Sequence, residues 1–185
     1  MALTQPPPPV KYFIAVLFGN SRFLAPVRSR FIETWGEIDF EGEDHPFDVT
    51  DYYADEMGSP LFRRIFSFKT LSPPDRLVAM KLICNALEEQ TMVGGKRTVN
   101  CDAGYLDHNK TVLASAKEAG QKIYLDKGIY ADLAGRYKNG AYRSFEWSFP
   151  DFKDGRYDRE LLSIRAKYLT QRKIWRRGEE GGKTA

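Results

Sequence analysis

A dense set of polar side chains lies between residues 98 and 137 of this 185-residue chain. The set combines carboxylates, amides, phenols and lysines, which are the groups that bind anions and hard cations. A lysine can neutralise a phosphate, and a carboxylate can act as a base or as a metal ligand. We expect the ligand-binding side chains to be Asn100, Asp102, Tyr105, Lys110, Lys117 and Lys127, joined by Asp51 and Tyr53 from an earlier loop.

The first of two predicted turns spans residues 100–110, between two predicted strands. Asn100 and Asp102 are two residues apart, so they share a face if this stretch is extended. Gly104 permits a backbone conformation that other residues resist. The alternative is a tight hairpin whose polar side chains bond only their own backbone.

The second predicted turn spans residues 126–130, with Lys127 at its tip. We expect it to line one cleft together with the turn at 100–110, and Lys117 lies between them in the sequence. The lysines favour a small anionic ligand, phosphorylated or nucleotide-like. The alternative for Lys127 is a hairpin tip that faces solvent.

The earlier loop, residues 48–56, carries four acids together with Tyr52 and Tyr53. Clustered carboxylates suit a hard cation or a substrate, which is the functional interpretation of Asp51 and Tyr53. The structural interpretation is that Thr50 or Asp51 caps a short helix whose acids are solvated.

The sequence lacks the motifs of several common kinds of functional site. The two histidines, His45 and His108, have no second ligand at metal-binding spacing. Cys84 and Cys101 lack the spacing of a zinc site or a disulfide scaffold, and we expect both to be buried thiols. The serine-hydrolase elbow and both glycine-rich nucleotide motifs are absent from the sequence. The sequence therefore indicates no metal site, leaves the cofactor unknown, and does not decide whether the protein is an enzyme.

The composition is that of a globular domain, with 42% hydrophobic and 29% charged residues. A net charge of +3 does not favour nucleic acid as a partner, although it does not exclude it. The apolar run Tyr12 to Phe18 is seven residues long, far short of a membrane span, and no secretory signal is recognisable. We therefore expect a cytoplasmic protein that does not bind membranes. Its oligomeric state is not predicted.

Hydrophobic periodicity and turn residues predict the elements that must position these side chains. Val10 to Phe18 is too apolar to alternate, so we expect a strand covered on both faces. Gly36 should end the first helix, and Asn139-Gly140 should form a hairpin turn. The predicted helices are 22–35, 75–90 and 157–176, and the predicted strands are 10–18, two short pieces within 37–49, 61–71, 97–101, 110–116, 121–126, 129–137 and 140–146.

This order predicts an α+β fold with one antiparallel or mixed sheet. Its first six elements have the βαββαβ order of a ferredoxin-like fold, extended by further antiparallel strands and a C-terminal helix. We expect the helices mainly on one face of the sheet. A β-barrel with flanking helices is the alternative. The predicted organisation is a proline-rich tail over 1–9, one domain over 10–176 and a flexible tail over 177–185.

The C-terminal helix supports a different function. Its basic residues are Arg165, Lys167, Arg172, Lys173, Arg176 and Arg177. Such a helix could serve a non-enzymatic protein- or RNA-interaction module, although Asp158 and Glu160 dilute its charge.

Three stretches of the chain resemble one known family. They are HPFDVTDYYADEMG, RTVNCDAGYLDHNKTVLASAKEAGQKIYLDKGIYADL and the closing WSFPDF. The resemblance covers roughly residues 10–175 and is to the uncharacterised prokaryotic family catalogued as domain of unknown function 4416. Ala103 stands where that family commonly has proline, a change that would loosen the turn we expect there. The family has no established activity, so the resemblance implies a single domain of this size without a mechanism.

Overall fold

The computed structural model describes residues 3–182 of the chain. The described helices are α1 (Leu24–Trp35), α2 (Ala54–Met57), α3 (Leu77–Gln90), α4 (Pro150–Lys153) and α5 (Asp158–Gly182), with single 3-10 turns before α1 and α3. The described strands are β1 (Lys11–Phe18), β2 (Ile38–Glu41), β3 (His45–Pro46), β4 (Phe62–Phe68), β5 (Val99–Leu106), β6 (Lys110–Ser115), β7 (Ile123–Asp126), β8 (Ile129–Lys138) and β9 (Ala141–Ser144).

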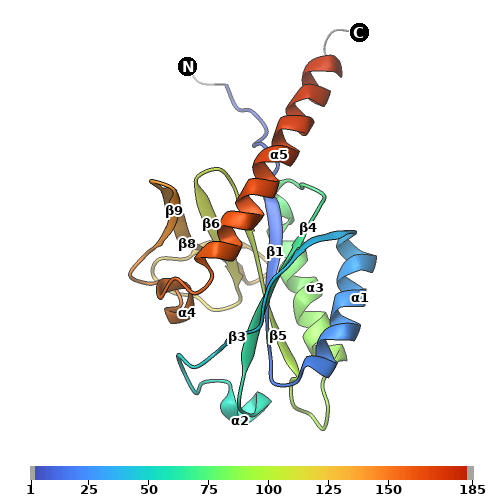
Figure 1. Ribbon diagram of the computed structural model, residues 1–185, viewed down its shortest axis with the longest axis vertical. Coiled ribbons are helices and arrows are strands. Elements are labelled where there is room, and N and C mark those ends of the chain that lie inside the picture. The colour runs from blue at the N-terminus through green and yellow to red at the C-terminus, as the bar shows by residue number, and fades with distance from the viewer. Residues whose placement is uncertain (1–2, 183–185) are drawn as a thin grey trace.

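These nine strands form one sheet within the described part of the chain (Figure 1). Its main order is β2-β4-β1-β5-β6-β8-β7, with β3 beside β4 and β9 beside β8. All eight strand pairs are antiparallel. The predicted α+β class, with an antiparallel sheet and a C-terminal helix, is confirmed.

The strand β1 lies in the middle of the sheet, between β4 and β5. All eight of its residues are buried, including Lys11. The prediction that this apolar run is covered on both faces is confirmed. An uninterrupted apolar sequence is what a strand needs when side chains on both sides meet a packed layer.

Helices cover both faces of the sheet, so the expectation that they lie mainly on one face is wrong. On one face, α1 and α3 pack through Phe31, Met80 and Cys84 onto alternate residues of β1 and β5. On the other face, α5 packs through Ile164 and Tyr168 onto the intervening residues. Figure 1 shows α5 crossing the face of the sheet opposite α1 and α3. Because strand side chains alternate, each strand contributes to both cores.

Two predicted turn signals are confirmed. Gly36 caps α1 with a φ of +83°, a value that glycine adopts without strain. Asn139 and Gly140 have φ angles of 52° and 82° and join β8 to β9 in a two-residue hairpin.

The stretch expected as a turn from residue 100 to 110 is mostly the strand β5, and the turn itself is confined to 107–109. Ala103 is therefore a fully buried strand residue and not part of a turn. Gly104 is needed for space: a Cβ there would lie 2.7 Å from the Val112 carbonyl oxygen and 2.9 Å from the Phe13 ring. The expectation of an unusual backbone conformation at Gly104 is replaced by close packing.

The helix α5 continues to Gly182, beyond the predicted end near 176. Its C-terminal half projects beyond the sheet, as Figure 1 shows. Residues 1–2 and 183–185, which belong to the two predicted tails, lie outside the described residues. Within residues 3–182, no helix combines the length and the apolar composition that a membrane crossing requires.

Candidate functional site

A cleft opens where two neighbouring strands part. The strands β5 and β6 pair only over Gly104–Leu106 and Thr111–Leu113. Beyond these residues β6 stays paired with β8 as far as Ser115, while the first half of β5 stays paired with β1. The sheet therefore separates between the start of β5 and the end of β6.

Two side chains of α3 take the place of the missing strand partner. The Cys101 N–H donates to Glu88 Oε1 over 2.8 Å, and Lys81 Nζ donates to the Cys101 carbonyl oxygen over 3.0 Å. Lys81 and Glu88 are seven residues apart, two helical turns, so both extend from the face of α3 that carries Cys84. Their burial is explained by the two backbone groups that they satisfy.

The cleft has a volume of about 260 Å³ and a mixed polar and aromatic lining. Four of its lining side chains are cationic and two are acidic. Arg97 and Lys122 also pair with Glu56 and Asp132, which lie outside the lining. The lining residues are Tyr52, Tyr53, Lys81, Asn85, Glu88, Arg97, Asn100, Asp102, Ala114, Ser115, Ala116, Lys117, Lys122 and Phe149.

Arg97 holds three elements together at one end of the cleft. It donates two hydrogen bonds to Glu56 of α2, over 2.7 and 2.6 Å, and one to Glu88 of α3 over 3.0 Å. It also donates to Asn100 Oδ1 of β5 over 2.9 Å. The bonds to Glu56, together with the single bond to Glu88, outweigh desolvation and raise the pKa of Arg97, so its charge is permanent.

Asn100 presents a hydrogen-bond donor that the described residues do not use. Its side chain is buried, with only 5% of the residue exposed. Its Oδ1 accepts from Arg97, but its Nδ2 has no partner among the described residues. Leaving such a buried donor unsatisfied costs about 1–3 kcal/mol. A ligand oxygen in the cleft would remove that cost.

Asp102 forms the wall opposite α3 and is held by a buried arginine. Arg63 of β4 donates to Asp102 Oδ2 over 3.0 Å and lies 2.9 Å from Asp151 Oδ2. Tyr157 also donates to Asp151, so the arginine lies between two oriented carboxylates. Arg63 is only 2% exposed. Asp102 is therefore already paired and fixed in position, which suits it to orienting a ligand.

Two further lysines line the cleft, of which Lys117 is exposed and Lys122 has a buried side chain. Lys117 Nζ donates to the Tyr52 hydroxyl over 2.6 Å, and this bond lowers the pKa of that phenol. Lys122 Nζ donates to Ser115 Oγ over 2.8 Å and lies 3.9 Å from Asp132 Oδ2. Behind them, burial and then the charge of Asp102 raise the pKa of Tyr53 to about 12. Tyr53 is therefore a neutral hydrogen-bond donor at physiological pH.

The structure brings four of the eight predicted site residues together. Asn100, Asp102, Lys117 and Tyr53 line this cleft. Residues 126–130 do not line it, so the expected meeting of the turns at 100–110 and 126–130 is wrong. Asp51 is exposed in the neighbouring loop and is not among the lining residues.

The other three predicted site residues lie elsewhere. Tyr105 and Lys110 line a separate hollow of about 210 Å³, and Lys110 Nζ pairs with Asp107 there. Tyr105 is an odd-numbered residue of the same strand as Asn100 and Asp102, so its side chain points to the other face. Lys127 is exposed at the tip of the β7–β8 hairpin.

Lys81, Glu88, Arg97 and Lys122 are cleft residues that the sequence analysis missed. Lys81 and Glu88 could have been identified from the sequence, because both lie on the apolar stripe of a predicted helix. A lysine or a glutamate is rarely buried there without a specific partner.

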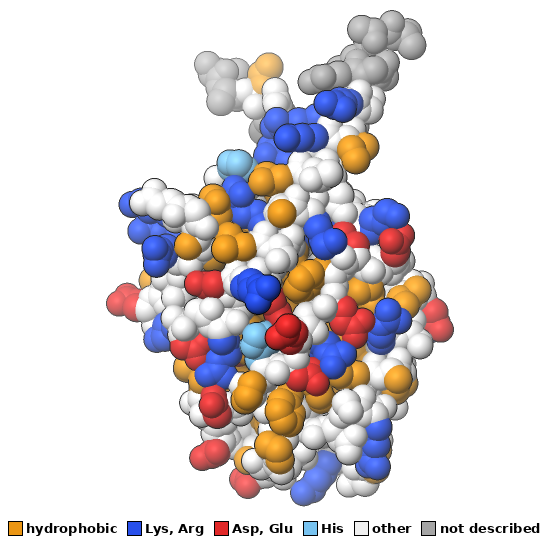
Figure 2. Space-filling view, in the orientation of Figure 1, with side chains coloured by type: hydrophobic (Ala, Val, Ile, Leu, Met, Phe, Trp, Pro, Cys, Tyr) orange, Lys and Arg blue, Asp and Glu red, His pale blue; other side chains and the backbone are white. Residues whose placement is uncertain are grey.

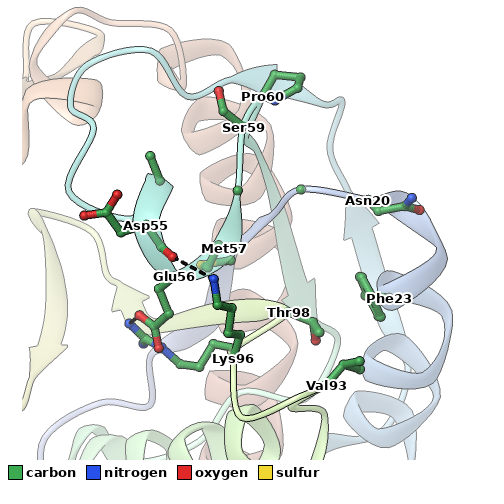
Figure 3. Close-up of a pocket in the computed structure, with 14 residues that line it drawn as sticks. Asn20, Phe23, Asp55, Glu56, Met57, Ser59, Pro60, Val93, Lys96 and Thr98 are labelled. Atoms are coloured by element: carbon green, nitrogen blue, oxygen red, sulfur yellow. Dashed lines mark hydrogen bonds and ion pairs between the residues drawn. The ribbon is translucent and has the colours of Figure 1, made fainter.

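A second hollow of about 410 Å³ adjoins the cleft at Arg97. It is bounded by Gly19 and Asn20 after β1, by residues 54–60 and by Val93 and residues 96–98. Figure 3 shows Lys96 pointing to the backbone of Asp55, to whose carbonyl oxygen it donates over 3.3 Å. The two cations of this hollow, Lys96 and Arg97, are matched by Asp55 and Glu56. It therefore has no excess charge to attract an ion.

Comparison with known proteins agrees with the resemblance seen in the sequence. Residues 8–168 match the model of a family described as Domain of unknown function (DUF4416). Searches of curated proteins and of solved structures gave no match. Within the described residues, no group of three or more His, Cys, Asp or Glu side chains is arranged to hold a metal ion.

Proposed function

The chain belongs to the DUF4416 family, and we propose that it binds a small anionic ligand, phosphorylated or nucleotide-like, in the cleft between β5 and β6. The observation that carries the proposal is the unpartnered Nδ2 of Asn100 inside a cleft whose lining has more cationic than acidic side chains. A phosphoryl oxygen accepts hydrogen bonds and carries negative charge, so it satisfies both features at once.

In this proposal, each group of side chains in the cleft has a separate role. Lys117, which is exposed, neutralises the anion, and Asn100 Nδ2 donates to it. The rings of Tyr52 and Phe149 offer aromatic surface to any attached organic group. Asp102 and Glu88 are already paired with cations, so they orient the site and repel the anion less than free carboxylates would.

Calorimetric titration of the purified protein tests the proposal, with inorganic phosphate, pyrophosphate, a sugar phosphate and a nucleoside monophosphate as probes. We expect at least one probe to bind and to raise the melting temperature. Lys117→Ala should weaken its binding about tenfold, ~1.4 kcal/mol. The matched control is Lys110→Ala, which removes an equivalent charge from the other hollow. The proposal fails if no probe binds, or if the two variants weaken binding equally.

A second candidate function is favoured by the shape of α5. Its C-terminal half projects from the domain, and Figure 2 shows lysine and arginine side chains gathered on it. Ile174 and Trp175 are 65% and 39% exposed there. We propose this segment as the contact surface if the protein is instead a non-enzymatic protein- or RNA-interaction module. Replacing Arg172, Lys173, Arg176 and Arg177 together by Ala should then abolish retention of the partner in a pull-down, whereas unchanged retention would remove this candidate.

We also propose the finer description of the fold as ferredoxin-like in β1, α1, β2, β4, α3 and β5, with β3 and α2 inserted between β2 and β4. The neighbouring order β2-β4-β1-β5, with α1 following β1 and α3 following β4, supports it.

A further inference from the structure

A hollow of about 370 Å³ lies where the segment joining β2 to β3 meets the first turns of α5. It is separate from the cleft between β5 and β6, and the two share no lining residue. Its volume falls within the range of pockets that hold small molecules, roughly 300–1,000 Å³. Three of its lining side chains are acidic, and three others are arginine or histidine.

Glu160 contributes to this hollow a buried carboxylate with only one oxygen in use. The residue is 7% exposed. Its Oε1 accepts from the Glu43 N–H over 2.9 Å and lies 2.8 Å from His45 Nε2. Its Oε2 has no hydrogen-bond partner among the described residues. Gly42, which also lines the hollow, leaves room for the carboxylate, since a Cβ there would lie 2.7 Å from Oε2. A buried acceptor without a donor is costly, so a donating group of a ligand would stabilise it.

The charges that remain unpaired around the hollow are of both signs. Glu41 and Arg156 are each held in two ion pairs with residues outside the lining. Within the described residues, the exposed Glu43 and Arg159 form no ion pair. Glu160 faces a cation only when His45 is protonated. A simple anion would therefore leave the two carboxylates unpaired, and a simple cation would leave the guanidinium unpaired.

We propose that this hollow binds a free α-amino acid, which carries both charges on adjacent groups. Its ammonium donates to Glu160 Oε2, and its carboxylate accepts from the guanidinium of Arg159, as charge-assisted hydrogen bonds require. Phe40, another lining residue, offers apolar surface to the side chain of the ligand. This inference is independent of the ligand proposed for the cleft between β5 and β6.

Calorimetric titration of the purified protein with the standard L-amino acids tests the proposal. At least one of them should bind. The amide of that amino acid lacks the carboxylate, and its N-acetyl derivative lacks the ammonium. Each derivative should bind about tenfold more weakly, because each loses a hydrogen bond between charged groups. The proposal is overturned if no amino acid binds, or if either derivative binds as tightly as the amino acid itself.

Arg159→Ala tests the contact with the ligand carboxylate. It should weaken binding of the amino acid about tenfold and weaken binding of its amide much less. The matched control is Arg176→Ala, which removes an exposed arginine of the same helix outside the hollow and should bind like the wild type. Wild-type affinity in Arg159→Ala, or an equal loss in Arg176→Ala, would overturn the proposal.

Glu160→Gln tests the contact with the ligand ammonium. The glutamine keeps the size of the side chain but lacks the negative charge, so affinity for the amino acid should fall about tenfold. Affinity for the N-acetyl derivative, which has no ammonium, should change much less. Circular dichroism melting checks that the variant is folded, and wild-type affinity in the folded variant contradicts the proposal. If this buried substitution prevents folding, the exposed Arg159 still decides the question.

Discussion

Two buried lysines on opposite faces of the sheet show how differently the fold treats the same side chain. Lys11 is 0% exposed beneath α5, and Lys81 is 7% exposed on α3. The ammonium of Lys11 donates to Asp39, to Gln171 and to the Phe68 carbonyl oxygen, over 2.7 to 2.9 Å. Its three protons are therefore all used, within a cluster that joins β1, β2 and α5 and leaves no room for a ligand.

Lys81 belongs to a cluster that is open on one side. It donates to the Cys101 carbonyl oxygen and lies 3.6 Å from Glu88. Burial lowers the pKa of Lys11, and Asp39 offsets this only in part. Burial also opposes the charge of Lys81, but Asp102 and Glu88 together outweigh it and raise its pKa. A closed cluster stabilises the fold, whereas an open one with several charges can receive a ligand.

The largest expected effect comes from breaking the closed cluster. Asp39→Ala leaves the Lys11 ammonium buried without its carboxylate, so we expect a loss of about 3–5 kcal/mol in the free energy of unfolding. Lys11→Met should cost less, because Asp39 keeps its bonds from Ser67 and Gln171. Urea denaturation measures both losses. A greater loss from Lys81→Met than from Asp39→Ala would contradict the distinction between the two clusters.

The next largest effect is a difference between Lys81 and Lys11 in their contribution to ligand affinity rather than to stability. Lys81→Met removes a positive charge from the wall of the cleft, so it should weaken binding of the phosphate probe about tenfold, ~1.4 kcal/mol. Lys11→Met removes an equally buried charge from the other face and should leave the affinity unchanged. Calorimetric titration of both folded variants decides this. If both variants weaken binding equally, the open cluster has no special role.

A smaller effect appears in acid, where protonation of Asp39 should weaken the closed cluster. Burial alone would raise the pKa of Asp39, but the hydrogen bond and the charge of Lys11 lower it below its ordinary 3.8. Since the folded state holds this carboxylate charged, its stabilisation is fully present above pH 3.8 and is lost as the pH falls through the lowered value. The difference in unfolding free energy between wild type and Asp39→Asn should therefore shrink in that range. Urea titrations at successive pH values measure it, and a difference that stays constant would contradict the assigned pairing.

The sequence predicted those parts of the fold that depend on local signals. The buried β1, the stop at Gly36 and the Asn139-Gly140 hairpin each follow from a few adjacent residues. The separation of β5 from β6 does not follow from adjacent residues. It depends on β6 remaining paired with β8, and strand pairing is decided between segments far apart in the sequence. Since that parting opens the cleft, the location of the cleft was not predictable either.

The candidate site was predicted where strand alternation applies and missed where pairing across elements decides. Asn100 and Asp102 were correctly placed on one face, being two residues apart. Tyr105 was predicted as a site residue because it is close in sequence. It is an odd number of residues from Asn100 and Asp102, so its side chain lies on the other face of the sheet. Arg97 was not predicted because its role depends on hydrogen bonds to α2 and α3. No local sequence pattern reveals bonds between distant elements.

The smallest expected effect concerns Lys127, a lysine that belongs to neither cluster. It adopts a φ of +50° in the two-residue turn between β7 and β8, while the equivalent residue of the next hairpin is Asn139, with a φ of 52°. Asparagine tolerates this left-handed backbone better than lysine does. Lys127→Asn should therefore raise the free energy of unfolding by up to about 1 kcal/mol, and the reciprocal Asn139→Lys should lower it by a similar amount. Urea denaturation measures both changes.

Titration of Lys127→Asn with the phosphate probe should show unchanged affinity, because Lys127 lies outside the cleft. A clear loss of affinity would instead return this lysine to the binding site.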